Sequence, residues 1–294
     1  MKDLISKALD STFNELKDES LGDKLINGKV REIVDLGDTL VLTTSDRISA
    51  FDRTLSTIPF KGEVLNRLSL YWFEQTKDII QNHIIEQVSP RSIHVNKCDV
   101  LPVEVIVRGY LTGSAWRDYQ KGNDISGITL PAGMKMDQEF PTPLLTPSTK
   151  ADQGDHDEPI SSEDIVKKGL VEKDLWEKVE KTALALFERG SELADKQGLI
   201  LVDTKYEFGL LNGELVVVDE VHTPDSSRFW YKETYKEAFD NGEQQKKVDK
   251  EFLRQWLMDQ GFMGDGVAPV ISDDMRSQIA LKYIEAFELI TGQE

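Results

Sequence analysis

The strongest constraint on the fold comes from residues 199–221, which carry the pattern of a β-hairpin. Two mostly apolar stretches, 199–208 and 214–221, flank the dipeptide Asn212-Gly213. Asn-Gly readily supplies the two positive φ angles that a tight turn between antiparallel strands requires. We therefore expect the chain to contain an antiparallel sheet.

A second hairpin is predicted near the N-terminus, where residues 29–36 and 39–44 flank a Gly-Asp turn. Apolar residues at helical spacing predict helices over residues 3–17, 62–77, 174–198, 246–260 and 272–291. We expect Asp174 and Ser272 to act as N-caps. Hairpins dominate, and strands do not alternate strictly with helices. The fold class is therefore predicted to be α+β with antiparallel sheets, not a doubly wound parallel sheet.

Residues 120–160 differ from the rest of the chain. They hold half of the 10 prolines, together with many Gly, Asp and Thr residues. A segment of this length and composition is predicted to be a functional loop or to be disordered.

The charge balance restricts the classes of partner. The 294 residues include 35 Lys and Arg against 53 Asp and Glu, a formal net charge of −18. This argues against a general binder of nucleic acid or membrane surfaces, because both favour basic proteins. A small anionic substrate in a locally basic pocket remains compatible with it.

Cys98 is the only cysteine, which excludes an intrachain disulfide and a cysteine-based zinc site. The N-terminus lacks the pattern of a secretory signal, and no apolar run approaches the ~20 residues of a membrane helix. A cytoplasmic protein is therefore expected. No metal-ligand spacing, and hence no catalytic role, is found for the histidines, His83, His94, His156 and His222.

Gly28 lies in a segment that resembles a P-loop only superficially. Five residues separate it from Gly22 where a P-loop has four, and Val30 occupies the place of the magnesium-binding hydroxyl. Dinucleotide, kinase and hydrolase signatures are also absent. Lys29 and Arg31 nevertheless alternate along a predicted strand and share one face. This spacing suits the binding of a polyphosphate. The alternative interpretation is a solvated strand edge.

Arg108 lies at the end of a predicted buried strand that begins at Val103 and ends at Gly109. It is followed by two glycines and two hydroxyls, Thr112 and Ser114. Glycines let backbone N–H groups approach an anion closely, and arginine binds phosphate or carboxylate through two parallel hydrogen bonds. The segment is predicted to bind an anion. The alternative is an ordinary glycine turn with a surface arginine.

Three further segments, 44–52, 146–150 and 222–230, gather hydroxyl and charged side chains. Loops at strand ends often carry function, but residues of these types also cap local turns. The candidate ligand-binding residues in these segments are Asp46, Ser49, Lys150, Asp225, Ser227 and Arg228.

The 199–221 hairpin is the best candidate for a catalytic site. Asp203, Lys205 and Glu207 alternate and therefore share one face of its first strand, while Asp219 lies on the return strand. Charges on an otherwise apolar hairpin are costly unless they are paired or bind a metal ion. Carboxylates plus phosphate oxygens are typical ligands of Mg²⁺. The alternative interpretation is a strand face whose charged side chains form salt bridges.

The register of this hairpin limits a shared metal site. A regular two-residue turn pairs Glu207 with Val218, which places Asp219 on the opposite face. We therefore predict an irregularity, at the turn or at Gly209, if Glu207 and Asp219 bind one metal ion. A regular ladder with the two carboxylates on opposite faces would remove this hypothesis.

Taken together, these segments resemble the SAICAR synthetase family, phosphoribosylaminoimidazole-succinocarboxamide synthases, in the longer, yeast-like form. Each motif is weak alone, but they occur in family order between about residues 25 and 230. The motifs are Gly28-Lys29-Val30-Arg31-Glu32, residues 46–52, residues 107–114, Thr146-Pro147-Ser148-Thr149-Lys150, residues 202–209, and residues 219–230.

The resemblance implies an ATP-dependent ligase of de novo purine biosynthesis. Such an enzyme joins L-aspartate to carboxyaminoimidazole ribonucleotide (CAIR), giving SAICAR, ADP and phosphate through an acyl phosphate on the CAIR carboxylate. The implied fold has two lobes, related to ATP-grasp enzymes and protein kinases, with ATP and Mg²⁺ in the cleft. Residues 1–105 would form the N-terminal lobe and residues 106–294 the C-terminal lobe. A cytoplasmic monomer acting on small molecules, without nucleic acid or membrane, is implied.

The resemblance also implies a role for each candidate residue. ATP would contact Gly28, Lys29, Arg31, Glu207 and Asp219. Mg²⁺ would bind Glu207 and Asp219, and these two residues and Lys205 would be catalytic. CAIR and aspartate would contact Asp46, Ser49, Arg108, Thr112, Ser114, Lys150, Asp225, Ser227 and Arg228, with residues 46–52 closing over them.

Two other functions remain open at this level. A small-molecule kinase could use the same lobes to transfer phosphate to a hydroxyl without ligation. A nucleotide-binding regulator without catalysis is the second alternative, although the retained acidic pair and cations argue against it.

Overall fold

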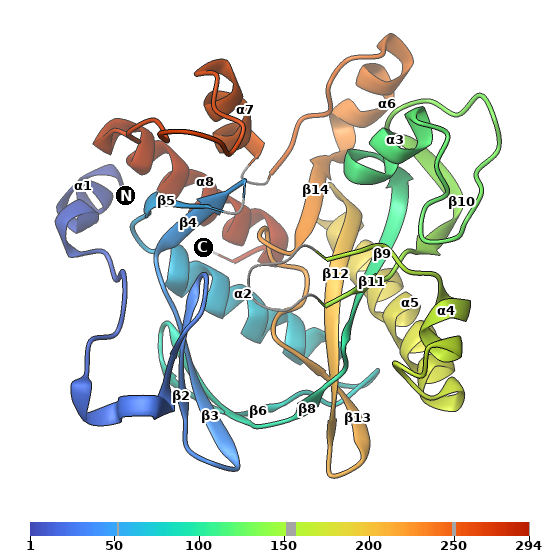
Figure 1. Cartoon of the computed structure of the whole chain (residues 1–294). Coiled ribbons are helices and arrows are strands. Elements are labelled where there is room, and N and C mark those ends of the chain that lie inside the picture. The colour runs from blue at the N-terminus through green and yellow to red at the C-terminus, as the bar shows by residue number, and fades with distance from the viewer. Residues whose placement is uncertain (52, 151–156, 249–250, 294) are drawn as a thin grey trace.

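The computed structural model describes residues 1–51, 53–150, 157–248 and 251–293, and its sheets are antiparallel (Figure 1). This confirms the predicted α+β class. No helix in the described ranges is long and apolar enough to span a membrane. The helices are α1 (Lys2–Ala8), α2 (Lys61–Thr76), α3 (Gly113–Gln120), α4 (Ser162–Lys167), α5 (Lys173–Lys196), α6 (Lys232–Asn241), α7 (Glu251–Asp259) and α8 (Asp273–Thr291).

The N-terminal part of the chain forms a five-stranded sheet in the order β1-β2-β3-β7-β6. Its β2–β3 hairpin is the one predicted from residues 29–44. Leu42, Ile93 and Val95 form a small buried cluster on this sheet, and Leu70 of α2 packs against it. The strands are β1 (Leu25–Asn27), β2 (Arg31–Asp35), β3 (Thr39–Thr44), β6 (Ile84–Ser89) and β7 (Ser92–Asn96). A separate hairpin follows β3, formed by β4 (Arg47–Ala50) and β5 (Arg53–Thr57).

The second sheet has seven strands and is centred on the long strand β12. Its main path is β10-β9-β12-β13, while β11 pairs with β9, and β8 and β14 pair with β12. Helix α5 packs along β9 and β12, and buries Val179, Ala183 and Leu186 in the main core. The strands are β8 (Asp99–Val100), β9 (Val103–Leu111), β10 (Gln138–Leu145), β11 (Ser148–Thr149), β12 (Leu199–Leu211), β13 (Glu214–Val218) and β14 (Ser227–Tyr231).

The β12–β13 hairpin has a regular ladder, so the predicted irregularity is wrong. Glu207 pairs with Val218, and the pairing continues without a shift to the turn. Gly209 serves another purpose, because a Cβ there would lie 3.1 Å from the Cβ of Cys98 beside β8. Asp219 follows the last pair with a left-handed φ of 66°, which turns the chain out of the strand.

Several helix and loop predictions need correction. The predicted helix 3–17 ends as α1 at Ala8, and Glu172, not Asp174, occupies the N-cap of α5. The segment 120–160 contains β10 and β11, which were not predicted because of the prolines in this segment. Prolines are tolerated in β10 because it is an edge strand. Residues 151–156 of this segment, including His156, lie outside the described residues.

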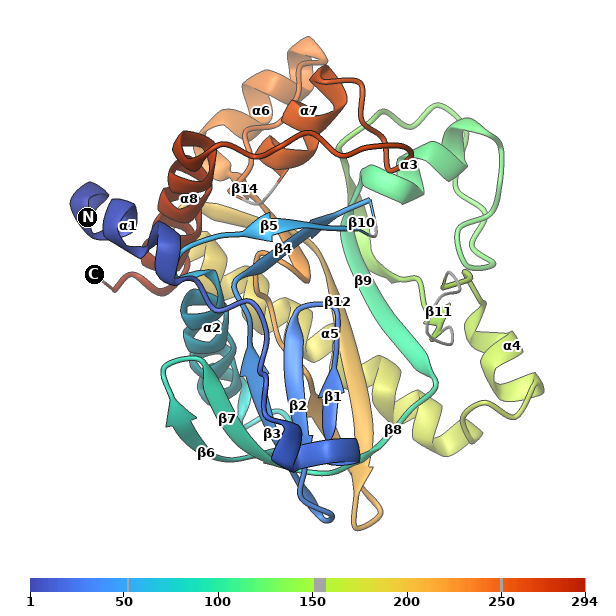
Figure 2. The same ribbon diagram turned by 60° about the vertical axis from the view of Figure 1, so that its left-hand side comes forward.

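Two features of the structure lie across the expected division into two lobes. The boundary between residues 105 and 106 falls inside β9, which belongs wholly to the second sheet. Helix α8, assigned to the second lobe, packs on α2 beside α1 (Figure 2). The N-cap of α8 is as predicted, because the Ser272 hydroxyl accepts a hydrogen bond from the Met275 N–H at 3.3 Å.

Two histidines are buried where the fold keeps them neutral. Neither ring nitrogen of His83 has a hydrogen-bond partner, and desolvation lowers its pKa to about 4. His222 is fully buried between Trp72 and Tyr206, and desolvation lowers its pKa to about 3. Both values lie below the ordinary 6.5, so the unfolded chain binds protons that the native state rejects.

Acidification is therefore expected to destabilise the protein through His83 and His222. Stability from these groups is complete above pH 6.5 and is lost as the pH falls toward 4. Each buried histidine should reduce the free energy of unfolding by about 2 kcal/mol between pH 6.5 and 5. Urea unfolding of the protein and of His222→Gln at both pH values tests this. Equal pH slopes for the two proteins would contradict it.

Candidate functional site

A cavity of about 530 Å³ lies between the two sheets and gathers residues from both. Its walls have an apolar part, formed by Ile33, Leu40, Leu42, Val95 and Val100. Another part of the wall contains all five residues predicted to contact ATP, four of them charged, together with Lys150. The five are Gly28, Lys29, Arg31, Glu207 and Asp219. An apolar wall beside clustered charges suits a ligand with a planar base and a polyphosphate.

The glycine turn at one wall is held from behind by Arg47. Its Nε donates to the Lys29 carbonyl at 3.0 Å, and its Nη2 donates to the Gly28 carbonyl at 2.9 Å. The guanidinium also forms an ion pair with buried Glu32 at 2.6 Å. A Cβ on Gly28 would lie 2.9 Å from the Arg31 carbonyl oxygen, so the turn is too tight for a side chain. Arg47 thus positions the residues that face the cavity.

The charged residues of β9 and β12 form rows across the two strands. The register pairs Asp203 with Arg108 and Lys205 with Ile106, and it ends with Tyr206 paired to Val105, next to Glu207 on β12 and Glu104 on β9. The Lys205 ammonium forms an ion pair with Glu104 and lies 3.7 Å from Glu207. Lys205 therefore lies between two carboxylates that would otherwise repel each other.

Glu104 is a site residue that the sequence analysis did not select. Glu104 is 7% exposed. The sequence feature that could have identified it is its position in β9, where it alternates with buried valines and lies on the same face as Arg108. Burial raises the pKa of Glu104, although Lys205 opposes the shift. Burial also acts to lower the pKa of Lys205, but Glu104 and Glu207 outweigh it and leave the pKa raised. Lys205 is thus held as a cation.

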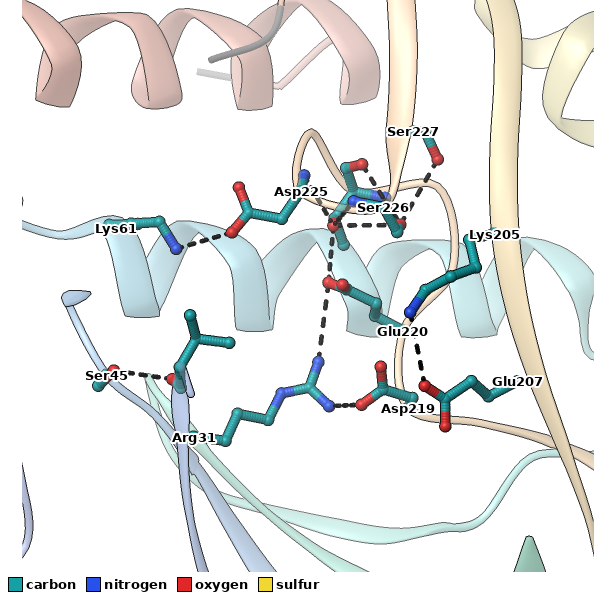
Figure 3. A network of polar contacts seen from close by, with 12 residues as sticks. Arg31, Ser45, Lys61, Lys205, Glu207, Asp219, Glu220, Asp225, Ser226 and Ser227 are labelled. Carbon is teal, nitrogen blue, oxygen red and sulfur yellow. Dashed lines mark hydrogen bonds and ion pairs between the residues drawn. The ribbon is translucent and has the colours of Figure 1, made fainter. Parts of the chain in front are cut away.

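Two further cations neutralise the predicted metal-binding carboxylates, and Figure 3 shows the first of them, Arg31, beside Asp219. Arg31 Nη1 donates to Asp219, and Arg31 Nη2 lies 3.7 Å from Glu220. Lys150 donates to Glu207. Burial acts to raise the pKa of Glu207, but Lys150 and Lys205 outweigh it and leave the pKa lowered. Glu207 is therefore ionised.

Glu207 and Asp219 reach one cavity despite the regular ladder. The left-handed backbone at Asp219 makes the turn that a bulge was expected to make. Carboxylate oxygens fit a hard divalent cation such as Mg²⁺. The described residues contain no group of three or more Asp, Glu, His or Cys that could hold a metal ion. A cation at this pair would need further oxygen ligands, such as those of phosphates.

Arg108 and Arg228 converge on Asp203 at the other end of the face. Their Nη1 atoms lie 3.3 and 2.5 Å from the same Asp203 oxygen. Arg108 also donates to the Ser114 hydroxyl at 3.3 Å, and burial lowers its pKa. A smaller cavity of about 240 Å³ adjoins Arg228 and is lined by Thr112, Gly113, Arg117 and Lys247. Clustered cations and an α3 N-terminus suit a phosphate or carboxylate.

Other predicted residues lie outside the two cavities. Asp46 is 1% exposed, and its carboxylate accepts hydrogen bonds from the backbone N–H groups of Phe13 and Gly62, which indicates a structural role. Ser49 lies in β4 opposite Thr54.

Ser227 and Asp225 are likewise engaged with the chain itself. The Ser227 hydroxyl shares a hydrogen bond with that of Thr204 at 2.7 Å. The Asp225 carboxylate bonds Lys61 and Tyr283. Asp52, at the end of the segment expected to close over the substrates, lies outside the described residues.

Comparisons with known proteins agree on one family. The sequence model of the family described as SAICAR synthetase matches residues 24–269. A phosphoribosylaminoimidazole-succinocarboxamide synthase from Bacteroides thetaiotaomicron is 48% identical over 273 residues, covering 91% of this chain and 87% of the relative. One from Legionella pneumophila strain Lens is 46% identical over 277 residues, covering 92% and 88%.

Solved structures show the same relationship. SAICAR synthase from Saccharomyces cerevisiae, complexed with SAICAR, has a TM-score of 0.83 at 36% identity, covering 95% of this chain and 99% of that one. A SAICAR synthetase in complex with ADP has a TM-score of 0.70 at 28% identity, covering 92% and 98%.

Proposed function

The chain belongs to the SAICAR synthetase family, and we propose that its cavity binds ATP and Mg²⁺ to ligate CAIR with L-aspartate. The products are SAICAR, ADP and phosphate, in de novo purine biosynthesis. The observation that carries the residue assignment is the cavity itself, where the five residues expected to contact ATP meet from both sheets. A related synthetase structure that contains ADP supports nucleotide use.

In this proposal the apolar wall around Leu40, Leu42 and Val95 takes the base of ATP. Lys29, Arg31 and Lys150 take its phosphates. As the phosphates arrive, Arg31 and Lys150 exchange Asp219 and Glu207 for phosphate oxygens, which frees both carboxylates. Mg²⁺ bound by Glu207, Asp219 and the phosphates would neutralise charge on the transferring group. The chain's own contribution is positioning and charge stabilisation, as in other phosphoryl transfers.

The reaction then needs a second anion site for the ribotide. Arg108, Ser114, Thr112 and Arg228 are proposed to hold the CAIR phosphate beside the smaller cavity. The CAIR carboxylate would lie near Lys205, whose ammonium stabilises the charge that develops as phosphate is transferred. The aspartate amine then attacks the acyl phosphate, and phosphate leaves as the amide bond forms.

One assay tests the proposed function against its alternatives. ADP release is measured with ATP, Mg²⁺, CAIR and L-aspartate, and each component is omitted in turn. Turnover that requires both CAIR and aspartate is expected. ADP formed at full rate without aspartate would indicate a kinase, and no ADP under any condition would indicate a binding protein.

We also propose that the enzyme acts as a monomer in the cytoplasm, as the longer family form implied. Size-exclusion chromatography with light scattering should give a mass near 33.3 kDa at micromolar concentration. A mass of twice this value would contradict the monomer.

Gly113→Ala is expected to weaken ribotide binding specifically. Gly113 has a left-handed φ of 60°, and a Cβ there would lie 2.5 Å from the Arg228 guanidinium. The substitution should displace Arg228 and raise KM for CAIR about tenfold, the loss of one charge-assisted hydrogen bond. KM for ATP should change less than twofold. Gly122→Ala is the control, because its positive φ adds similar strain with no atom within 4 Å. Equal effects of the two substitutions would contradict the prediction.

A further inference from the structure

The turn between β1 and β2 is held from behind by residues 45–47, which follow β3. Three consecutive carbonyls of the turn, those of Gly28, Lys29 and Val30, accept hydrogen bonds from this segment. The Val30 carbonyl accepts from the N–H and from the hydroxyl of Ser45, at 2.9 and 2.7 Å (Figure 3). Arg47 donates to the other two carbonyls, at 2.9 and 3.0 Å. The position of the turn therefore depends on residues 45–47.

Residues 45–47 are themselves bound by the N-terminal part of the chain. The Phe13 N–H donates to Asp46 Oδ2 at 2.7 Å, and the Phe13 carbonyl accepts from the Asp46 N–H at 2.8 Å. The Asn14 carbonyl accepts from Arg47 Nη1. The main chain of Phe13 and Asn14 thus bonds two of the three residues that hold the turn.

The side chains in this contact are buried and charged. Asp46 is 1% exposed, and Arg47 is 8% exposed. Asp46 Oδ1 lies 3.2 Å from Arg91 Nη1, and the Arg91 guanidinium lies 5.3 Å from the centre of the Phe13 ring. A guanidinium is a rigid fork of donors, and a buried donor that loses its partner carries the full cost of desolvation. Displacement of Phe13 should therefore also displace Arg47 and the turn.

The same N-terminal segment is anchored on its other side, away from the cavity. The Thr12 and Thr57 hydroxyls share a hydrogen bond at 2.7 Å. Arg276 of α8 donates to the carbonyls of Leu9 and Thr57, each at 2.8 Å. The described residues that line the cavity of about 530 Å³ include none of residues 9–14. The segment can therefore act on a ligand in that cavity only through other residues.

We infer that Phe13 and Asn14 are positioning residues for the nucleotide, which act through residues 45–47 on the turn. The inference rests on the proposed function for the identity of the ligand. Gly28, Lys29 and Val30 all line the cavity, so a shift of the turn changes its wall. Coupling between two sites is reciprocal, so a nucleotide bound at the turn should strengthen the contacts of Phe13. Affinity for ATP should therefore depend on main-chain groups that do not touch ATP.

Phe13→Pro tests this, because proline lacks the N–H that bonds Asp46. Thr12 has φ −66° and ψ 142°, an extended conformation that a following proline accepts. Kd and KM for ATP should rise about five- to tenfold, while kcat and KM for CAIR change less than twofold. Phe13→Ala is the matched control, because it removes the ring beside Arg91 and keeps the N–H. Equal effects of the two substitutions, or equal changes for ATP and CAIR, would overturn the positioning role.

An Arg47→Lys background tests the route of the effect. Lysine keeps the charge but lacks the fork of donors that holds the Gly28 and Lys29 carbonyls. Phe13→Pro should then raise Kd for ATP less than twofold further. Full additivity of the two substitutions would show that Phe13 does not act through Arg47, and would overturn the inference.

Hydrogen–deuterium exchange of the unmodified protein needs neither a substitution nor turnover. Saturating ATP with Mg²⁺ should slow exchange of the Phe13 and Asp46 amides and leave the amides of α1 unchanged. Unchanged exchange at Phe13 and Asp46, in a protein that calorimetry shows to bind ATP, overturns the inference alone. Absence of ATP binding rejects the proposed function and the inference with it. Slower exchange in a protein that does not release ADP with CAIR and aspartate would retain the positioning and reject the ligase.

Discussion

Replacement of Lys205 by methionine is expected to lower kcat by on the order of 10²- to 10³-fold, the usual cost of removing one group that stabilises transition-state charge. Methionine keeps most of the length of the side chain and removes the charge. The ammonium is held between Glu104 and Glu207, so its loss removes the one cation that contacts both carboxylates among the described residues. KM for ATP should change much less than kcat. Steady-state ADP release with saturating CAIR and aspartate measures both constants.

A surface lysine provides the control for this substitution. The Lys236 side chain of α6 is 86% exposed and pairs with Asp240 one turn away, so Lys236→Met should leave kcat unchanged. Lys205→Met also leaves Glu104 and Glu207 facing each other. The double variant Lys205→Met/Glu104→Gln should therefore regain thermal stability without regaining activity. A Lys205→Met enzyme with kcat within threefold of the unmodified protein would contradict the assigned role.

The hairpin and the faces of its strands could be predicted from sequence because they depend on local rules. Asn212 and Gly213 both have positive φ, as the tight turn requires. Strand alternation correctly placed Lys205 and Glu207 on one face, since a period of two needs no knowledge of the partner strand. The α+β class followed from the same local signals.

Contacts between distant segments could not be predicted in the same way. Lys61 and Asp225 are 164 positions apart, and nothing near Lys61 in the sequence distinguishes it from a surface lysine at a helix start. The pairing of Glu104 with Lys205 required the register between β9 and β12. The alternation of β9 showed on which face Glu104 lies, but not what lies opposite.

The metal hypothesis illustrates a third kind of limit. The prediction that Glu207 and Asp219 lie on opposite faces is valid for regular strands, and the pairing of β12 with β13 is regular. It failed because Asp219 is the first residue beyond β13, where a left-handed φ ends the alternation. Aspartate adopts a left-handed φ more readily than most residues do. The end of β13 was therefore as good a candidate as a bulge for the place where the regular alternation stops.

The overall charge of −18 is consistent with an anion site once the local pairs are considered. Arg31 and Lys150 neutralise Asp219 and Glu207. In the proposed function, these cations become available to phosphates when the carboxylates bind Mg²⁺. Distant surface acids are largely screened at cellular ionic strength. The site therefore depends on few cations, and on the two carboxylates that pair with them.

Glu207→Gln and Asp219→Asn are each expected to lower Mg²⁺-dependent turnover by on the order of 10²-fold or more. Both substitutions preserve shape and remove the charge that a hard cation requires. Calorimetry should show that Mg²⁺ no longer strengthens ATP binding by the variants, a readout independent of catalysis. Glu214→Gln is the control, because Glu214 is exposed at the start of the same β13. Near-normal rates in either variant would exclude that carboxylate as a metal ligand.

The two substitutions should differ in the absence of metal, because each releases a different cation. Asp219→Asn frees Arg31, and Glu207→Gln frees Lys150, while Glu220 remains within 3.7 Å of Arg31. Glu207→Gln should therefore increase metal-free affinity for ATP more than Asp219→Asn does, since no second carboxylate in the described part of the chain forms an ion pair with Lys150. Metal-free titration with ATP measures the difference. Weaker metal-free ATP binding by Glu207→Gln than by the unmodified protein would show that Lys150 does not move from Glu207 to the phosphates.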